Sequence, residues 1–179
     1  MKKYFIVAGE PSGDLHGSKL IKAIKDLNPN SSFMGHGGDS MRNEGMHIIE
    51  HVDSLAIMGF AEVLRHLPRM NKIMKSTVRA IERSKPDRVI LIDYPGFNLR
   101  LAKRLSPLKI PITYFILPQA WAWKQRRVEV LKRFIDQSIS IFPFENDWYK
   151  KHGLRVDYFG HPFVCLLYTS PSPRDTNES

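Results

Sequence analysis

The chain is predicted to be an α/β protein, a Rossmann-like parallel sheet sandwich with helices on both faces. Its strand candidates are continuous apolar runs, such as Val-Ile-Leu-Ile at residues 89–92. Continuous runs are typical of strands that are buried on both faces, whereas half-exposed strands alternate apolar and polar residues. Segments with helical spacing separate these runs, and strands that alternate with helices indicate a parallel sheet. The 179 residues are enough for one domain with a sizeable core.

The order of elements follows from the same patterns. Strands are predicted at residues 4–8, 32–34, 48–50, 88–92, 112–115 and 137–142. The first helix follows the first strand, with Ser12 as its N-cap and Pro29 just beyond its end. Gly17 lies on the apolar face of this helix, where a glycine allows close approach to the sheet. Further helices are predicted over residues 54–83, with a break near Pro68, and over residues 100–105 and 126–134.

Composition narrows the class of protein without selecting a function. No apolar run reaches the ~18 residues that a membrane-spanning helix needs. The one cysteine, Cys165, excludes an internal disulfide and fits a reducing cytoplasm. Lys and Arg number 27 against 18 acidic residues, a formal charge of +9. Such a charge suits phosphate, nucleic acid or an anionic membrane surface, and the excess alone does not choose among them.

The loop after the first strand reads VAGEPSGDLHG, residues 7–17. Its glycines have neither the G-x-G-x-x-G spacing of dinucleotide sites nor the spacing of the P-loop. Glu10 and Asp14 also place negative charge where a phosphate would bind. The loop therefore favours a ligand with hydroxyl groups, which these carboxylates and Ser12 can hydrogen-bond. A turn that caps the helix without binding any ligand explains the spacing equally well.

Asp93 directly follows the apolar run at residues 89–92, so it is placed at the carboxyl end of a strand. Pro95 and Gly96 indicate a turn, and Asn98 is a candidate cap of the next helix. A carboxylate beside an apolar wall has a raised pKa and is suited to act as a general base. The alternative is that Asp93 only braces the loop.

Two further motifs allow several interpretations. Trp121 and Trp123 precede a basic stretch, a combination that suits stacking on nucleic acid, contact with an anionic amphiphile, or plain packing. His161, in FGHPFV, is more often structural than catalytic when it stands alone. The histidines and the single cysteine show no metal-ligand spacing, so we expect no metal site.

The C-terminal stretch differs from the rest of the chain. After Val164 the sequence continues CLLYTSPSPRDTNES, which is rich in Ser, Pro and Thr and loses its periodicity. We interpret residues 1–164 as the domain and residues 165–179 as a tail that is either foreign to it or a disordered natural end. The abrupt change favours the foreign tail, in which case the natural protein continued differently past Val164.

Six motifs together resemble one known family. VAGEPSGDLHG, AIMGFAEVL, IDYPGFN, LPQAWAWKQRRV, FPFE and FGHPFV occur in the order and spacing of the N-terminal half of lipid-A-disaccharide synthases. The resemblance covers residues 1–164 and implies the N-terminal domain of a GT-B glycosyltransferase. Members transfer 2,3-diacylglucosamine from UDP-2,3-diacylglucosamine to the 6-hydroxyl of 2,3-diacylglucosamine 1-phosphate. The resemblance implies an inverting, metal-independent reaction without a cofactor.

The resemblance also implies roles for particular residues. Glu10, Ser12 and Asp14 are expected near hydroxyls of the acceptor sugar, and Asp93 corresponds to the general base. We also expect Asn98 and Trp123 to contact substrate. Gly96 departs from the family, because many members carry a second acid there. The UDP-binding determinants belong to a C-terminal domain that this chain lacks, so we do not expect turnover by the chain alone.

A surface is expected to meet the membrane and the acyl chains. Its apolar members are Ala61, Val63, Leu64, Leu67 and Met70, and cations are interleaved with them. Such a helix suits the interface of an anionic bilayer, although an amphipathic helix packed on the sheet shows the same pattern. The implied location is the cytoplasmic face of the inner membrane.

The remaining expectations concern partners. We expect a homodimer of the full-length protein and no nucleic acid partner. The rival interpretations are another GT-B enzyme with a lipid acceptor, and a basic module that binds nucleic acid or membrane. A related enzyme of peptidoglycan synthesis would carry a first loop of the G-G-T-G-G type, which this sequence lacks.

Overall fold

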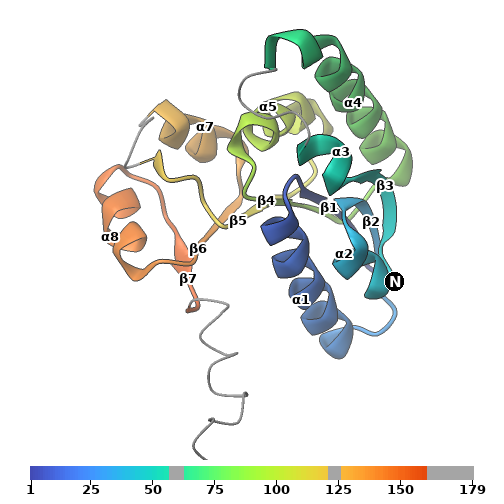
Figure 1. The fold of residues 1–179 in the computed structure, drawn as a ribbon. Coiled ribbons are helices and arrows are strands. Elements are labelled where there is room, and N and C mark those ends of the chain that lie inside the picture. Colours follow the sequence, from blue (N-terminus) through green and yellow to red (C-terminus); the bar gives the residue numbers. More distant parts are fainter. Residues whose placement is uncertain (57–62, 121–125, 161–179) are drawn as a thin grey trace, which may run out of the picture.

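The computed structural model describes residues 1–56, 63–120 and 126–160. Seven strands form one parallel sheet in the order β3-β2-β1-β4-β5-β6-β7 (Figure 1). The chain winds outward from β1 to β3 and then returns to place β4 on the other side of β1. The strands are β1 (Lys3–Ala8), β2 (Ser32–Gly37), β3 (His47–His51), β4 (Arg88–Ile92), β5 (Ile112–Phe115), β6 (Gln137–Ser140) and β7 (Asp157–Tyr158).

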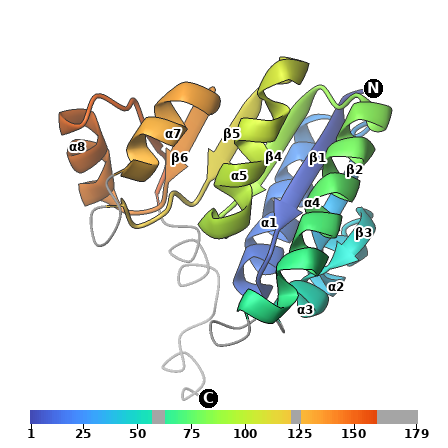
Figure 2. The same cartoon turned by 90° about the horizontal axis from the view of Figure 1, so that it is seen from above.

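Helices cover both faces of the sheet, with α1 and α2 on one face and α4, α5 and α7 on the other (Figures 1 and 2). No helix within the described residues combines the length and apolar character needed to cross a membrane. The helices are α1 (Pro11–Leu27), α2 (Asp39–Asn43), α3 (Val52–Ala56), α4 (Val63–Ser84), α5 (Pro95–Leu105), the short 3-10 helix η1 (Ser106–Leu108), α7 (Arg126–Phe134) and α8 (Pro143–Lys151).

The central strands β1 and β4 are buried on both faces because each of them contributes side chains to two cores. In β1, Phe5 and Val7 enter the cluster under α4 and α5, while Ile6 and Ala8 enter the cluster under α1. All four side chains are inaccessible to solvent. The prediction from continuous apolar runs is therefore confirmed. Gly17 also lies close to the sheet as expected, since a Cβ there would be 3.2 Å from Cδ1 of Ile92 in β4, and it lies still closer to α2, at 2.7 Å from the Sδ of Met41.

Some predicted boundaries were wrong. The first helix begins at Pro11, so Glu10 and not Ser12 occupies its N-cap position, without a side-chain cap bond. Helix α4 runs through Pro68 without a break. Helix α5 begins at Pro95, which places Asn98 inside the helix and not at its cap.

The C-terminal side of the fold also differs from the predictions. Strand β6 ends at Ser140, because the Ser140 hydroxyl turns back to the main chain of Phe142. Strand β7 and helix α8 were not predicted. Ala61, Trp121, Trp123, His161 and the tail from residue 165 lie outside the described residues, so the predictions about them stay predictions.

Asp14 supports helix α2 from the first turns of α1. Its Oδ1 accepts hydrogen bonds from the N–H groups of Gly38 (2.7 Å) and Met41 (3.1 Å), and its Oδ2 accepts one from Ser40 (3.0 Å). These donors belong to the start of α2, where main-chain N–H groups have no partner within the helix. The carboxylate is buried, with 6% of the residue exposed. Asp14 therefore joins the first loop to the loop after β2.

Asp14→Asn is expected to lower the free energy of unfolding by about 1–3 kcal/mol. The amide nitrogen of asparagine is a donor and replaces one acceptor oxygen, so at least one N–H group at the start of α2 loses its acceptor. Urea unfolding of the variant and the parent measures the difference. Asp26→Asn is the matched control, since Asp26 is an exposed carboxylate on the same helix. Equal stabilities of the Asp14→Asn and Asp26→Asn variants would contradict the capping role.

His36 on β2 is a buried histidine. Its Nε2 lies 3.0 Å from the Thr77 hydroxyl, which donates its own proton to the carbonyl of Ile73. The Thr77 oxygen therefore accepts, and Nε2 of His36 carries the proton. No partner of Nδ1 is found among the described residues. Burial lowers the pKa of His36 from 6.5 to about 4.

This lowered pKa predicts a loss of stability in mild acid. Below pH 6.5 the unfolded chain binds a proton at His36, whereas the folded chain does not until about pH 4. Stability should therefore fall by up to about 3 kcal/mol as the pH drops through this window. Urea unfolding at several pH values should show this loss of stability in the parent but not in His36→Gln. His47→Gln is the control and should behave as the parent, because His47 is exposed. Parallel curves for the parent and His36→Gln would refute it.

Candidate functional site

A cavity of about 390 Å³ opens at the carboxyl ends of the strands, beside the point where the strand order reverses between β1 and β4. In open α/β sheets, ligands bind at such a reversal. The start of α1 and the segments that follow β4, β5 and β6 contribute to the walls. The lining residues are Ser12, Gly13, His16, Asp93, Pro95, Ile116, Leu117, Pro118, Gln119, Arg127, Ile141 and Phe142.

Asp93 is the only carboxylate among these lining residues. Its pKa is raised from 3.8 to about 6, first by burial and then by the negative charge of Glu10. The N–H of Tyr94 and the positive charge of Arg127 act in the opposite direction without cancelling these effects. A carboxyl with this pKa is mostly ionised at neutral pH and takes up a proton more readily than an ordinary aspartate.

The main chain around Asp93 is fixed in an unusual conformation. Asp93 and Tyr94 have φ angles of 44° and 47°, in the left-handed region that non-glycine residues seldom adopt. The Asp93 carbonyl accepts hydrogen bonds from the Tyr114 hydroxyl (2.7 Å) and from Nδ2 of Asn98 (2.8 Å). The Asp93 N–H donates to the carbonyl of Phe115 (3.0 Å). These bonds from β5 and α5 hold the turn that carries the carboxyl group.

Asn98 ties the ends of two strands together. Besides Asp93, its Nδ2 approaches the carbonyls of Ile92 (3.2 Å) and Val7 (3.4 Å), which end β4 and lie near the end of β1. The residue is completely buried, and no partner of its Oδ1 is found among the described residues. Asn98 therefore stabilises the Asp93 turn through hydrogen bonds from α5. Its contact with substrate stays a prediction.

The first loop and the Asp93 turn lie in contact. The ring of Tyr94 lies so close to Gly9 that a Cβ at Gly9 would be 2.2 Å from Cδ1 of the ring. Glu10 raises the pKa of both Tyr94 and Asp93, which places its charge near the turn. Glu10 and Ser12 are exposed. Ser12 and Asp93 thus line the same cavity and Glu10 lies near Asp93, while Asp14 turns away toward α2.

Several lining residues were not predicted as parts of the site. His16 is buried and meets the ring of Phe115 edge-on, with ring centroids 6.3 Å apart. The sequence could have predicted this position, because His16 follows Ser12 by four residues and therefore lies on the same face of the helix. Ile116 has a φ of 64°, which is strained for a β-branched residue and typical of functional sites. Arg127 belongs to the basic stretch after Trp123, for which the sequence left nucleic acid, an anionic amphiphile and plain packing open.

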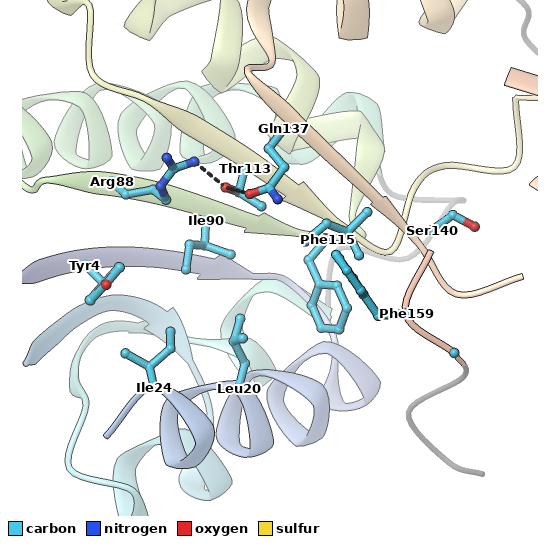
Figure 3. A pocket seen from close by; sticks show the side chains of 12 residues that line it. Tyr4, Leu20, Ile24, Arg88, Ile90, Thr113, Phe115, Gln137, Ser140 and Phe159 are labelled. Atoms are coloured by element: carbon cyan, nitrogen blue, oxygen red, sulfur yellow. Dashed lines mark hydrogen bonds between the residues drawn. The ribbon is translucent and has the colours of Figure 1, made fainter. Parts of the chain in front are cut away.

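A second cavity of about 420 Å³ lies over the sheet beside α1 (Figure 3). Leu20 and Ile24 of α1 face Ile90 and Phe115 of the sheet across it. Its lining contains no carboxylate, and the Arg88 guanidinium is engaged with the Thr113 hydroxyl at 2.8 Å. The Asp93 cavity is therefore the better candidate for a catalytic site.

Solved structures confirm the predicted fold class. The chain superposes on UDP-GlcNAc 2-epimerase from Neisseria meningitidis with a TM-score of 0.65 and 12% identity, over 94% of this chain and 48% of that one. S. aureus MnaA, from a co-structure with UDP, gives a TM-score of 0.65 and 14% identity, over 100% and 48%. At such identities the likeness shows the fold alone. The chain has the Rossmann-like N-terminal domain of a GT-B fold.

Sequence comparisons show the family. The family model described as lipid-A-disaccharide synthetase matches residues 4–177. Relatives named lipid-A-disaccharide synthase are 40% identical in Myxococcus xanthus, over 96% of this chain and 44% of the relative, and 43% identical in Acidobacterium capsulatum, over 89% and 40%. The chain thus spans less than half the length of these relatives. The family model also matches residues beyond Val164, whereas a foreign tail would not belong to the family. The structure does not describe these residues, so the foreign tail stays a prediction. This chain belongs to the lipid-A-disaccharide synthase family.

Proposed function

We propose that the Asp93 cavity binds the sugar acceptor of a lipid-A-disaccharide synthase. A full-length protein carrying this chain transfers 2,3-diacylglucosamine from its UDP derivative to 2,3-diacylglucosamine 1-phosphate and releases UDP. Membership of the family supports this reaction. Because the chain covers less than half the length of its relatives, the activity of the whole protein is a proposal. The observation that carries it is a partly buried carboxyl with a pKa of about 6 at the reversal of the strand order.

Asp93 acts as the general base in this proposal. Its carboxylate accepts the proton of the acceptor 6-hydroxyl while that oxygen bonds to the anomeric carbon of the donor. The bond from that carbon to the UDP oxygen breaks on the opposite side, so the configuration inverts. Ser12 lines the same cavity and Glu10 lies near Asp93, and in this proposal both hydrogen-bond sugar hydroxyls. The fixed turn contributes by holding the base where the nucleophile binds, since positioning lowers the barrier.

Asp93→Asn is expected to reduce kcat by about 10²–10⁴-fold, because the amide cannot accept the proton. Asparagine tolerates the left-handed conformation at this position, so the turn survives. The assay uses a chimera in which the C-terminal part of a relative completes the chain. In the parent chimera, kcat should rise as the pH increases through about 6, where Asp93 ionises.

The control is Asp87→Asn, which removes an exposed carboxylate just before β4, at the opposite edge of the sheet. Its kcat should match the parent. Retention of more than about a tenth of the parent kcat by Asp93→Asn, against the range expected for a general base, would make Asp93 a brace of the loop. The base would then be sought at Glu10 or in the rest of the protein.

We further propose that helix α4 binds anionic lipid at the inner face of the inner membrane. Arg69, Lys72, Lys75, Arg79 and Arg83 are exposed along it, and the last four line a hollow of about 520 Å³. Met70 is half-buried and packs on the core, so less of it faces outward than expected. Val63, Leu64 and Leu67 belong to α4, but their side chains, like Ala61, are not described. The homodimer also stays a prediction.

Replacing Lys72, Lys75 and Arg79 with Glu should lower binding to anionic vesicles by at least about a hundredfold, since each cation contributes about 1 kcal/mol near such a surface. Sedimentation with vesicles of anionic and neutral lipid measures the binding. Lys22→Glu on α1 serves as the single-charge control on another exposed helix face. Unchanged sedimentation of the triple variant, with native circular dichroism, would place the membrane contact elsewhere.

A further inference from the structure

We infer that Arg127 forms an anion subsite in the Asp93 cavity and binds the phosphate of the acceptor. The identity of that ligand rests on the function proposed above. Arg127 extends from the start of α7 and lines the cavity together with Asp93, Ser12 and Gln119. Two walls of one cavity thus carry opposite charges.

The positive charge of Arg127 has no counter-ion within the described part of the chain. The residue is half-buried, and no ion pair or hydrogen bond joins its guanidinium to any described residue. It does not form a salt bridge with Asp93, although its charge acts on that carboxyl at longer range. A half-buried charge without a partner is unfavourable, and a bound anion would offset that cost.

Apart from the Asp93 carboxylate, the ionisable groups on which the Arg127 charge acts are two neutral tyrosine hydroxyls. Its charge lowers the pKa of the hydroxyls of Tyr114 and Tyr149, but burial keeps both pKa values above their ordinary range. Each hydroxyl is also committed to a main-chain carbonyl, Tyr114 to Asp93 and Tyr149 to Pro118. Neither tyrosine competes with an external anion for the guanidinium.

The chemistry favours a phosphate over other anions. A guanidinium presents donors in a planar fork that matches two phosphate oxygens. A phosphate would be repelled by Asp93, so it binds at the Arg127 end and leaves the hydroxyl-bearing part of the ligand at the Asp93 end. The volume of about 390 Å³ is in the range of small-molecule sites. The opposite charges of Arg127 and Asp93 therefore orient a sugar phosphate so that one of its hydroxyls lies at the Asp93 carboxylate.

The diphosphate of the donor offers the same chemistry, so the experiment separates the two sources. The ¹⁵N-labelled chain is titrated by NMR with glucosamine 1-phosphate, with glucosamine and with UDP. The parent should bind glucosamine 1-phosphate at least about tenfold more tightly than glucosamine, as a charge-assisted contact predicts. The amide signals of Ser12, Asp93 and Arg127 should shift.

Arg127→Met removes the charge and keeps the length of the side chain, and it should bind glucosamine 1-phosphate no better than glucosamine. Arg127→Lys should retain part of the preference, because it keeps the charge without the fork. Arg126→Met is the control on the exposed neighbour in the same helix and should behave as the parent. The dispersion of the spectra shows that each variant is folded.

Three results would overturn the assignment. The first is equal binding of glucosamine 1-phosphate by the parent and by Arg127→Met. The second is no binding of glucosamine 1-phosphate by the parent up to a concentration on the order of 50 mM, where an affinity is too weak to be useful. The third is Arg127-dependent binding of UDP that is tighter than the binding of glucosamine 1-phosphate. Asp93→Asn separates this inference from the proposed function, because it should bind glucosamine 1-phosphate as well as or better than the parent. The anion subsite can therefore be correct even if Asp93 is not the base, and Asp93 can be the base even if the anion subsite is wrong.

Discussion

The site depends on one main-chain carbonyl. The carbonyl of Asp93 accepts one hydrogen bond from the Tyr114 hydroxyl and another from the side-chain amide of Asn98, and both of these residues are buried. Left-handed backbone at two consecutive non-glycine residues is unfavourable by about 1–3 kcal/mol each, and these bonds offset that cost. Without them the turn would relax to an ordinary conformation. The carboxyl group would then leave the apolar surroundings that raise its pKa.

The sheet supplies the partners of this carbonyl. Because the strands are parallel, the carboxyl ends of β1, β4 and β5 meet at one edge. Tyr114 reaches the turn from β5, and Asn98 reaches it from α5 and also holds the end of β4. The first loop closes over the turn because Gly9 leaves room for the ring of Tyr94. Fold and site are thus linked through contacts between neighbouring strand ends, and Arg127 completes the cavity from α7.

Local signals predicted much of the fold and part of the site. Apolar runs gave the bounds of β4 and β5 because burial on both faces shows within four or five residues. Asp93 was correctly placed at a strand end for the same reason. The role of Asp14 was not predictable, since its partners in α2 lie at least 24 residues away and α2 is too short to show a period. Asn98 reaches Val7, 91 residues away, so its pattern suggested a helix cap instead. Arg127 followed two tryptophans in a basic stretch, a pattern that indicates an exposed surface as readily as a site.

The most direct test is the titration of the Asp93 carboxyl carbon, followed by ¹³C NMR in the labelled chain with Asp93→Asn to assign the signal. The account predicts a midpoint near pH 6, because the fixed turn keeps the carboxyl beside apolar walls and Glu10. Tyr114→Phe removes one of the two bonds to the carbonyl and should move the midpoint toward the ordinary value. A midpoint near 3.8 in the parent would contradict the account, since Asp93 would then be a solvated carboxylate on a loose turn.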